Sequence, residues 1–397
     1  MSLTRSLTRP LTRKISRADL TQGFGGSFSP FALDPYLLFD ARDSMVGTLE
    51  NPTLDLNPAL PETLDVITAT RAGIATYTDP DGNIATASAD TVRVDYVDSV
   101  PMILVEPSAT NLVDYSEDFT HSSWTKSNAT LTDDYGIAPD GANTSTRIQY
   151  TGGSAYIADN VSSGTYTASA FVKGVAGEVV KFGIGANVGQ GAEFTLNGEW
   201  QRIQHTGTGG AIFFSSLGGN TATDFEIWGA QVETGSLTSY IPTSGGDAAA
   251  RTRAADDLVI SGSAFSSFFN TGGDGTFYAE FVPRDVLSEQ WYLLAGQSYN
   301  RRFMYTNDGN ARLNAYDGAT TRSYGVDMVA NQINRAAFTY TATTQEASID
   351  GAVTSPVAHN GNYSTTSRLH LASPANDKQM NGHIKRVLFW PYSSDRL

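Results

Sequence analysis

The chain has 397 residues, of which 40% are hydrophobic and 17% charged; its net charge is -15 and it contains no cysteine. That length predicts two or three domains with buried cores. The acidic charge argues against nucleic acid or anionic lipid as a partner, and the lack of cysteine excludes a disulfide framework and a cysteine-based metal site. No run approaches the roughly 20 apolar residues of a membrane helix, and the N-terminus lacks the apolar centre of a signal peptide. We therefore expect synthesis in the cytoplasm and no membrane insertion.

Residues 1–18 form a basic arm built on a four-residue repeat, Ser-Leu-Thr-Arg. The arm carries five basic residues and no acidic ones, and it is too short to bury a core of its own. A helix or an extended peptide would both fit the repeat. A disordered basic tail is the alternative, but a regular leucine series favours a peptide that orders on a partner. The predicted docking residues are Leu3, Arg5, Leu7, Arg9, Leu11 and Arg13.

Residues 19–106 mix loop-like and strand-like pieces, and we assign them to an attachment or adaptor region. Ala72 to Tyr77 and Ile84 to Ala87, separated by Asp79-Pro80-Asp81-Gly82, predict a hairpin. The turn resembles the start of a calcium loop, but Ile84 stands where such a loop needs glycine. A plain turn is therefore favoured, and we expect no cofactor, with a structural calcium ion as an unsupported alternative.

Residues 107–243 alternate apolar and polar side chains in short runs separated by glycine-bearing turns, which is typical of a sandwich or jelly roll. Residues 244–254 look like a linker, and residues 255–397 predict a second sandwich. Its Asp350-Gly351 pair is a strong hairpin signal. The expected fold is all-β, with an extended adaptor arm followed by two β-sandwich or jelly-roll domains. The strands expected in the first sandwich are 165–172, 179–184, 192–196, 200–205, 211–215 and 225–232, and those in the second are 275–282, 291–295, 335–340, 346–349 and 383–390.

Short motifs lie at residues 106–113, 115–119 and 124–126, at residues 228–233 and 239–243, and at Arg253-Ala254-Ala255-Asp256. They resemble the entry, closing strand and exit of a carbohydrate-binding-module-like jelly roll that is frequent in bacteriophage tail-fibre, tail-spike and head-fibre proteins. The last third, with Ala347 to Gly351 and the final strand Ile384 to Pro391, resembles a concanavalin A-like, laminin-G-type jelly roll. The two jelly rolls to which these segments belong cover about three quarters of the chain. The resemblance implies a virion location and glycan-directed folds.

A polysaccharide depolymerase is the enzymatic alternative. Cleaving a glycosidic bond usually takes two carboxyl groups about 5 to 9.5 Å apart, and residues i and i+2 of a strand lie on one face at roughly 6.6 Å. Only Asp224-Phe225-Glu226 offers that spacing cleanly, with Trp228 on the same face. An exposed polar face, calcium ligation or sugar hydrogen bonding explains this pair more simply. No catalytic triad or G-x-S-x-G elbow is recognisable, so we expect no enzyme activity.

Sugar binding needs exposed aromatic faces with planar polar side chains beside them. Trp200 and Trp390 enter or close strands and are expected in the core, whereas Trp124 and Trp228 fit either packing or a ligand platform. A dense polar and aromatic stretch in the last module suggests a receptor surface, with a solvated sheet face as the alternative. The predicted glycan-binding residues are Trp124, Asp224, Glu226, Trp228, Tyr299, Asn300, Arg302, Tyr305 and Tyr316.

The sequence thus predicts a virion fibre or spike protein. It would be made in the host cytoplasm, attach to other virion structural proteins through its N-terminus and present its sandwiches on the particle surface to host polysaccharide. The family resemblance favours a homo-trimer, although no heptads or β-helix repeats are visible. A decoration or adaptor protein that binds no glycan is the remaining alternative.

Overall fold

The computed structural model describes most of the chain after residue 51. Its described residues are 52–244, 251–269, 273–287, 291–296, 302–307, 309–319, 321–358, 366–372 and 378–393. They are almost entirely β, as the sequence predicts, with one short 3-10 helix, η1 (Pro61–Leu64), and one short α-helix, α2 (Gly262–Ser266). None of the described helices is long and apolar enough to cross a membrane. The predicted docking arm lies outside the described residues.

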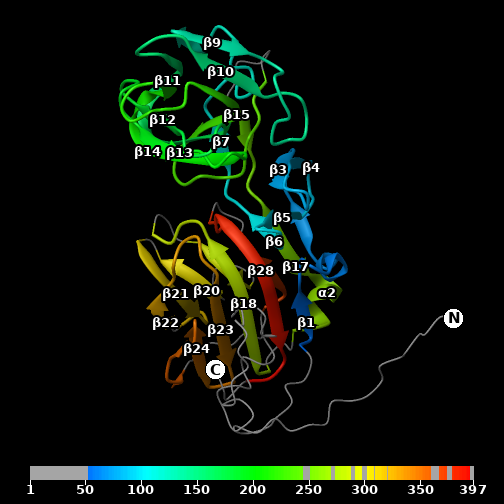
Figure 1. Ribbon diagram of the computed structural model, residues 1–397. Coiled ribbons are helices and arrows are strands. Elements are labelled where there is room, and N and C mark those ends of the chain that lie inside the picture. Colours follow the sequence, from blue (N-terminus) through cyan, green and yellow to red (C-terminus); the bar gives the residue numbers. More distant parts are fainter. Residues whose placement is uncertain are drawn as a thin grey trace, which may run out of the picture. The chain divides into compact units, whose positions relative to one another are not determined.

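The first sandwich is built around one eight-stranded antiparallel sheet (Figure 1). Its strand order is β13-β12-β14-β11-β15-β10-β9, with β8 pairing to β11. The strands are β8 (Thr125–Ser127), β9 (Ala129–Thr132), β10 (Thr146–Tyr150), β11 (Tyr156–Lys173), β12 (Val179–Gly185), β13 (Ala192–Thr195), β14 (Gln201–Ser215) and β15 (Asp224–Glu233).

Two long strands curl this sheet around its core. The sequence predicts separate strands at residues 200–205 and 211–215, but β14 runs through both without a break. Its partner β11 shifts register between Asn160 and Gly164, and such a bulge bends a strand without ending it. Alternate side chains of β10, β12 and β15, such as Ile148, Phe182 and Phe225, are buried in the resulting core.

The second sandwich pairs a nine-stranded sheet with a seven-stranded sheet. The first has the order β25-β24-β23-β18-β28-β6-β5, with β1 on β28 and β26 on β24; the second has the order β2-β17-β27-β19-β20-β21-β22. Their early strands are β1 (Leu54–Leu56), β2 (Thr68–Thr70), β5 (Arg93–Val97) and β6 (Val100–Val105). The later strands are β17 (Asp257–Ser261), β18 (Gly275–Pro283), β19 (Tyr292–Ala295), β20 (Arg302–Asn307), β21 (Asn310–Tyr316), β22 (Thr321–Asp327), β23 (Asn334–Tyr340), β24 (Thr344–Ile349), β25 (Ala352–Val353), β26 (Val357–Ala358), β27 (Arg368–Leu371) and β28 (Gly382–Trp390).

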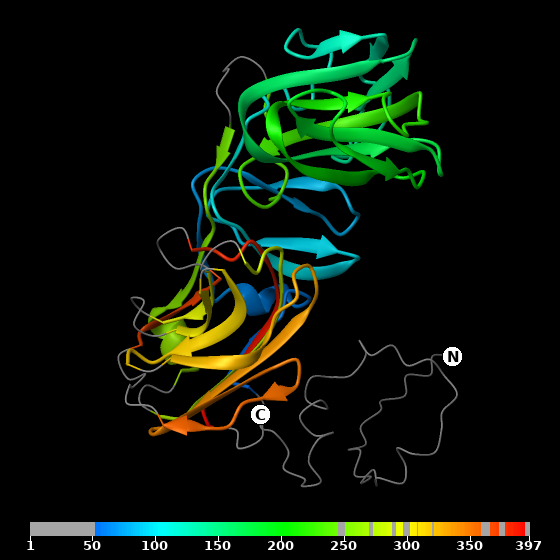
Figure 2. The same cartoon turned by 90° about the vertical axis from the view of Figure 1, so that its left-hand side faces the viewer.

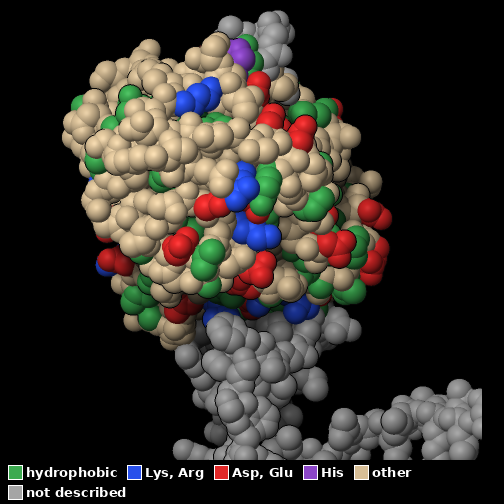
Figure 3. Space-filling model, turned by 45° about the horizontal axis from the view of Figure 1, so that its top comes forward, with side chains coloured by type: hydrophobic (Ala, Val, Ile, Leu, Met, Phe, Trp, Pro, Cys, Tyr) green, Lys and Arg blue, Asp and Glu red, His purple; other side chains and the backbone are tan. Residues whose placement is uncertain are grey.

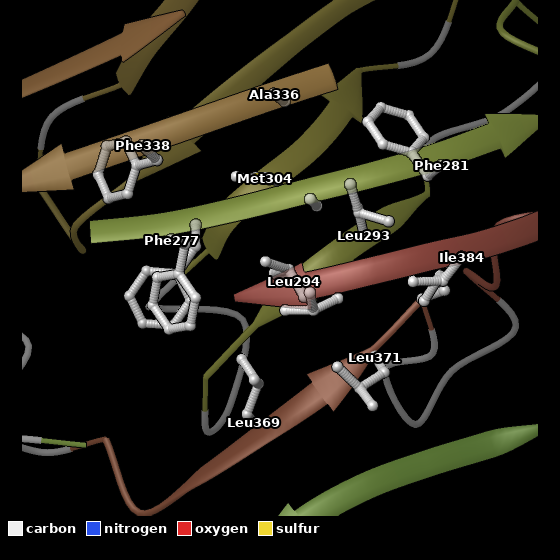
Figure 4. Close-up of a cluster of buried hydrophobic side chains, with 14 of the residues drawn as sticks. Phe277, Phe281, Leu293, Leu294, Met304, Ala336, Phe338, Leu369, Leu371 and Ile384 are labelled. Carbon is white, nitrogen blue, oxygen red and sulfur yellow. The ribbon is translucent and has the colours of Figure 1, made fainter. Parts of the chain in front are cut away.

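An aromatic-rich core lies between these two sheets (Figure 4). Phe277 on β18 packs against Phe303 on β20 and Phe389 on β28, with ring centroids 4.5 and 4.6 Å apart. Each fully buried phenylalanine side chain of this kind contributes about 1.5–3 kcal/mol through apolar burial. The predicted Asp350-Gly351 hairpin forms here between β24 and β25, with both residues at positive φ.

The strands of the second sandwich come from residues both before and after the first sandwich in the sequence. Strand β6 pairs with β28, and β2 pairs with β17, so segments coloured blue and cyan belong to the same sandwich as segments coloured green to red (Figures 1 and 2). Residues 107–243 are therefore inserted between two parts of one sandwich. Strands β1, β2 and β6, which lie within the residues that the sequence analysis assigns to an attachment or adaptor region, pair with strands of the predicted second sandwich. A regular alternation of side chains reveals strands but not which distant strand each one will meet.

The chain leaves and re-enters the second sandwich through a paired stem. Strand β7 (Ala109–Asn111) pairs with β16 (Arg251–Arg253), so the end of the predicted 244–254 linker is a strand. Beside the stem lies the predicted hairpin of β3 (Ala75–Thr78) and β4 (Ile84–Ala87). The Asp79 carboxylate in its turn accepts hydrogen bonds from the backbone amides of Asp81 and Asn83.

A buried cluster of ionised side chains lies at the foot of this stem. We call it the charge hub; its members are Arg71, Arg93, Glu106, Arg253, Asp256 and Arg284. Glu106 is fully buried and accepts hydrogen bonds from the backbone amide and hydroxyl of Ser239 at 2.6 and 2.7 Å. Burial by itself raises the pKa of Glu106, but the charges of the surrounding arginines outweigh it and hold that pKa well below its ordinary value.

The entry, closing and exit segments, whose motifs resemble those of a phage jelly roll, contact one another in and around the charge hub. Glu106 comes from the entry segment, Ser239 from the closing segment, and Arg253 and Asp256 from the exit segment. Asn111 of the entry segment also donates to the backbone oxygens of Ala230 and Ile241. In this chain these motif residues join the first sandwich to the second sandwich, into which it is inserted.

Candidate functional site

The outer face of the first sandwich carries a row of polar side chains across neighbouring strands. Antiparallel pairing places Thr132 of β9 opposite Arg147 of β10, Arg147 opposite Glu226 of β15, and Glu226 opposite Lys173 of β11. Directly opposed residues of an antiparallel pair point to the same face. The alternate residues of β15, Phe225 and Ile227, point into the core, so this row faces outward. Neighbouring strands lie about 4.8 Å apart, so its three intervals span roughly 14 Å.

An exposed tyrosine and an ion pair lie at one end of this row. Tyr135 is 46% exposed, and the Arg147 guanidinium carbon lies 4.8 Å from its ring centroid. Arg147 also binds Asp224 in a bidentate manner, with Nε donating to Oδ1 at 2.7 Å and Nη2 donating to Oδ2. Gln149 donates to the same Oδ2 at 3.2 Å. These contacts fix the Arg147 plane, and the hydrogen bonds from Arg147 lower the pKa of Asp224 below its ordinary value.

The next carboxylate in the row, that of Glu226, is held by the loop between β9 and β10. Glu226 accepts a hydrogen bond from the Ser145 hydroxyl at 2.6 Å. A Cβ on Gly136 would lie 2.6 Å from Glu226 Oε2, so a residue with a side chain at 136 would displace that carboxylate. The loop is itself closed by a backbone hydrogen bond from Tyr135 to Ser145. Glu226 and Tyr135 are therefore positioned by the same short segment.

Half-buried Trp200 marks the other end of the row. It precedes the β14 residue that pairs with Val172, which brings it next to Lys173. Its indole Nε1 donates to the Ile137 backbone oxygen at 2.9 Å, and the Ile137 side chain is 61% exposed. The sequence predicted Trp200 in the core, but this ring is only partly covered. We call the set Tyr135, Arg147, Lys173, Trp200, Asp224 and Glu226 the β10–β15 patch.

The surface of the first sandwich carries both charged and hydrophobic side chains, as the row does. Figure 3 shows basic, acidic and hydrophobic side chains close to one another on the face turned to the viewer, amid backbone and uncharged polar side chains. Among the described residues, no group of three or more histidine, aspartate or glutamate side chains could hold a metal ion. Planar polar groups next to an aromatic ring suit the hydroxyls and apolar faces of a sugar.

Two of the predicted glycan-binding tryptophans are packed inside the protein. Trp124 is 1% exposed, packs against Phe119 with ring centroids 4.8 Å apart, and donates its indole N–H to the Tyr115 backbone oxygen at 2.9 Å. Trp228 is 2% exposed and contacts Phe171 and Tyr240. Both side chains are almost fully covered, so neither ring has a face free for a sugar.

The predicted receptor surface of the last module comes together only in part. The Arg302 guanidinium lies 5.0 Å from the ring centroid of Tyr305, 5.4 Å from that of Tyr316 and 5.3 Å from that of Tyr292. Tyr305 and Tyr292 are buried, at 3% and 2% exposed, whereas Arg302 and Tyr316 are half-buried. Tyr299 and Asn300 lie outside the described residues. Glycan binding by this cluster stays a prediction.

The sequence pattern points to Asp224 and Glu226 but not to Tyr135 and Arg147. Arg147 is a polar residue within an alternating strand, which by itself signals only a solvated face. Tyr135 follows two aspartates in a turn-rich stretch, and only the closure of the loop over β10 brings it to the ion pair. An exposed aromatic in a loop next to an acid-x-acid strand is the signal that could have found it.

No protein-family model and no curated protein matches this chain. Among solved structures, it is similar to a mutant of Trypanosoma rangeli sialidase displaying trans-sialidase activity, at 13% identity and a TM-score of 0.28, over 35% of this chain and 24% of that one. It is also similar to the Ruminococcus gnavus IT-sialidase CBM40 bound to alpha2,3-sialyllactose, at 14% identity and a TM-score of 0.27, over 31% and 78% of the two chains. The receptor-binding domain of botulinum neurotoxin mosaic serotype C/D gives 9% identity and a TM-score of 0.28, over 36% and 38%. Such similarity leaves the function of this chain to be argued from its own residues.

Proposed function

We propose that this protein binds glycans through the β10–β15 patch. The observation that carries the proposal is an exposed tyrosine ring held beside a fixed Arg147–Asp224 pair. The ring offers apolar surface to a pyranose, and the planar polar groups offer hydrogen bonds to its hydroxyls. Because neighbouring contacts already hold these side chains in place, binding would cost little side-chain entropy.

Binding, and not hydrolysis, fits the chemistry of the two carboxyl groups. A glycosidase needs one carboxyl group with a raised pKa to protonate the leaving oxygen. Arg147 instead lowers the pKa of Asp224, and Asp224 already accepts several hydrogen bonds. A carboxyl group that stays ionised suits an acceptor for sugar hydroxyls and not a proton donor, so we propose that the chain has no catalytic role.

The test is glycan binding by the full chain and by Tyr135→Ala. We expect the wild-type protein to retain at least one host-surface glycan on an array. Calorimetry should then show about tenfold weaker binding for the variant, equivalent to about 1.4 kcal/mol. Leu60→Ala removes a hydrophobic side chain of similar exposure, 47%, from the second sandwich and should bind as wild type does. Equal affinities for wild type and Tyr135→Ala would refute the patch, and release of reducing ends during incubation would show hydrolysis instead.

We further propose that the protein is a virion fibre or spike component, attached to other virion proteins through its basic arm and assembled as a homo-oligomer, with a trimer expected. The regular leucine and arginine series of residues 1–18 supports attachment. The resemblance of the entry, closing and exit segments to phage structural proteins supports the location.

Replacing Leu3, Leu7 and Leu11 by alanine should abolish incorporation of the protein into particles while leaving glycan binding intact. The expected cause is the loss of the apolar stripe that would order on a partner. Quantitative immunoblotting of purified particles measures incorporation. The matched control exchanges Ser2 with Thr4 and Ser6 with Thr8, which keeps the leucine series. Undiminished incorporation of the leucine variant would rule out docking by this series.

A further inference from the structure

The single arginine of the β10–β15 patch already has an internal carboxylate partner. A ligand carboxylate binds arginine most strongly through two parallel N–H bonds. In Arg147, the Nε and Nη2 groups make that pair of bonds with Asp224. An acidic sugar would therefore have to displace Asp224 to use the same edge of the guanidinium.

The charges around this pair also disfavour an anionic ligand. Lys173, the remaining cation of the patch, stands opposite Glu226 in the strand pairing. The two cations of the patch are thus each faced by a carboxylate, Asp224 or Glu226, in a chain whose net charge is -15. Placing another carboxylate among them would be opposed by like-charge repulsion.

The same carboxylates suit hydroxyl donors. An ionised carboxylate offers about four lone-pair positions. Among the described residues, Ser145 supplies the side-chain hydrogen bond to Glu226, which leaves most of its acceptor capacity for a ligand. Hydrogen bonds from neutral hydroxyls to ionised carboxylates are among the stronger ones in proteins. An uncharged pyranose brings such hydroxyls together with an apolar face for Tyr135.

We infer that the β10–β15 patch selects uncharged glycans over sialylated or uronic-acid-containing ones. The inference rests on the glycan-binding function proposed above and adds the class of ligand. In this arrangement Asp224 has two effects: it accepts sugar hydroxyls, and it occupies the arginine edge that a ligand carboxylate would need.

The test uses the full chain and two oligosaccharides that differ only in a terminal sialic acid. By calorimetry in 20 mM and 300 mM NaCl, wild type should bind the neutral oligosaccharide at least tenfold more tightly at both salt concentrations. Asp224→Asn, which frees the Arg147 edge and removes one negative charge, should weaken neutral binding and shift the preference toward the sialylated compound by at least tenfold. Because Asp224 is exposed, the variant should keep the wild-type thermal midpoint. The control Glu62→Gln removes a negative charge from an exposed residue of the second sandwich and should leave the preference unchanged.

The outcomes separate this inference from the proposed function. Tighter binding of the sialylated compound by wild type would overturn the selectivity and leave glycan binding standing. An unchanged preference in Asp224→Asn would overturn the role given to that carboxylate. Absence of binding to every glycan on an array would overturn the proposed function together with the inference.

Discussion

Glu106→Gln should lower the free energy of unfolding by about 3–5 kcal/mol, because it leaves buried arginines without half of their counter-charge. Glu106 is fully buried and pairs with Arg93 at 2.9 Å and with Arg284 at 2.7 Å. Glutamine keeps the shape of the side chain but not its charge. Urea unfolding monitored by circular dichroism measures the change. Glu62→Gln, at an exposed position, is the matched control and should stay within about 0.5 kcal/mol of wild type.

The pH dependence of this difference has a definite sign. The pKa of Glu106 in the folded protein lies well below the ordinary value of 4.5 that the unfolded chain would show. Its stabilising contribution is therefore fully present above pH 4.5 and is lost as the pH falls below that value. We expect the difference in free energy of unfolding between wild type and Glu106→Gln to stay constant from pH 8 to 5 and to become smaller in stronger acid. A gap that widens on acidification, or a cost below 1 kcal/mol at pH 7, would contradict the account of the charge hub.

Gly209→Ala should destabilise the first sandwich by about 3 kcal/mol or more, because backbone atoms already occupy the space of a methyl group. A Cβ on Gly209 would lie 1.9 Å from the Gly185 carbonyl carbon and 2.3 Å from the Ala186 nitrogen. These are main-chain atoms of β12 and its following turn, so relief requires strands to move apart. Thermal unfolding should show a midpoint lower by several degrees or more.

Gly153→Ala is the matched control for this substitution. A Cβ there would meet nothing within 4 Å, so the stability should change by less than about 1 kcal/mol. Equal effects of the two substitutions would show that the close approach of β12 and β14 is not what requires glycine at residue 209.

The charge hub and the β10–β15 patch have opposite relations to solvent. In the hub, Glu106 and Asp256 are almost fully buried, so their ion pairs matter mainly because an unpaired partner would be costly. In the patch, Asp224 and Arg147 remain partly exposed, with 46% and 28% of their side chains accessible. Such an exposed pair adds little stability, which leaves its geometry free to serve binding. Substitutions in the hub should therefore alter stability, and substitutions in the patch should alter ligand affinity.

The all-β architecture was predictable from local sequence. Alternation of apolar and polar side chains has a period of two in any strand with one buried face, so β12, β15, β18 and β28 could be located within a residue or two. The Asp350-Gly351 hairpin was equally local, because both turn residues tolerate the positive φ that the turn needs.

The insertion of the first sandwich into the second was decided by tertiary structure. Strand β6 pairs with β28, which lies nearly 280 residues later in the chain. The periodicity of a strand carries no information about a partner so far away. Glu106, Arg253 and Asp256 were visible in the sequence as motif residues, but their burial in one hub follows only from that pairing.

The same division holds for the candidate site. The spacing of Asp224 and Glu226 is enough to place both carboxylates on one face of a strand. Their partners Arg147, on β10, and Tyr135, in the loop before it, could not be inferred, because strand register and loop closure bring them there. For Trp124 and Trp228 the sequence left two possibilities, because a tryptophan in such a segment suits a sugar platform and a core equally. The structure buries both side chains in the protein. Local pattern thus determined which residues form strands, whereas long-range pairing decided which side chains meet and which remain exposed to a ligand.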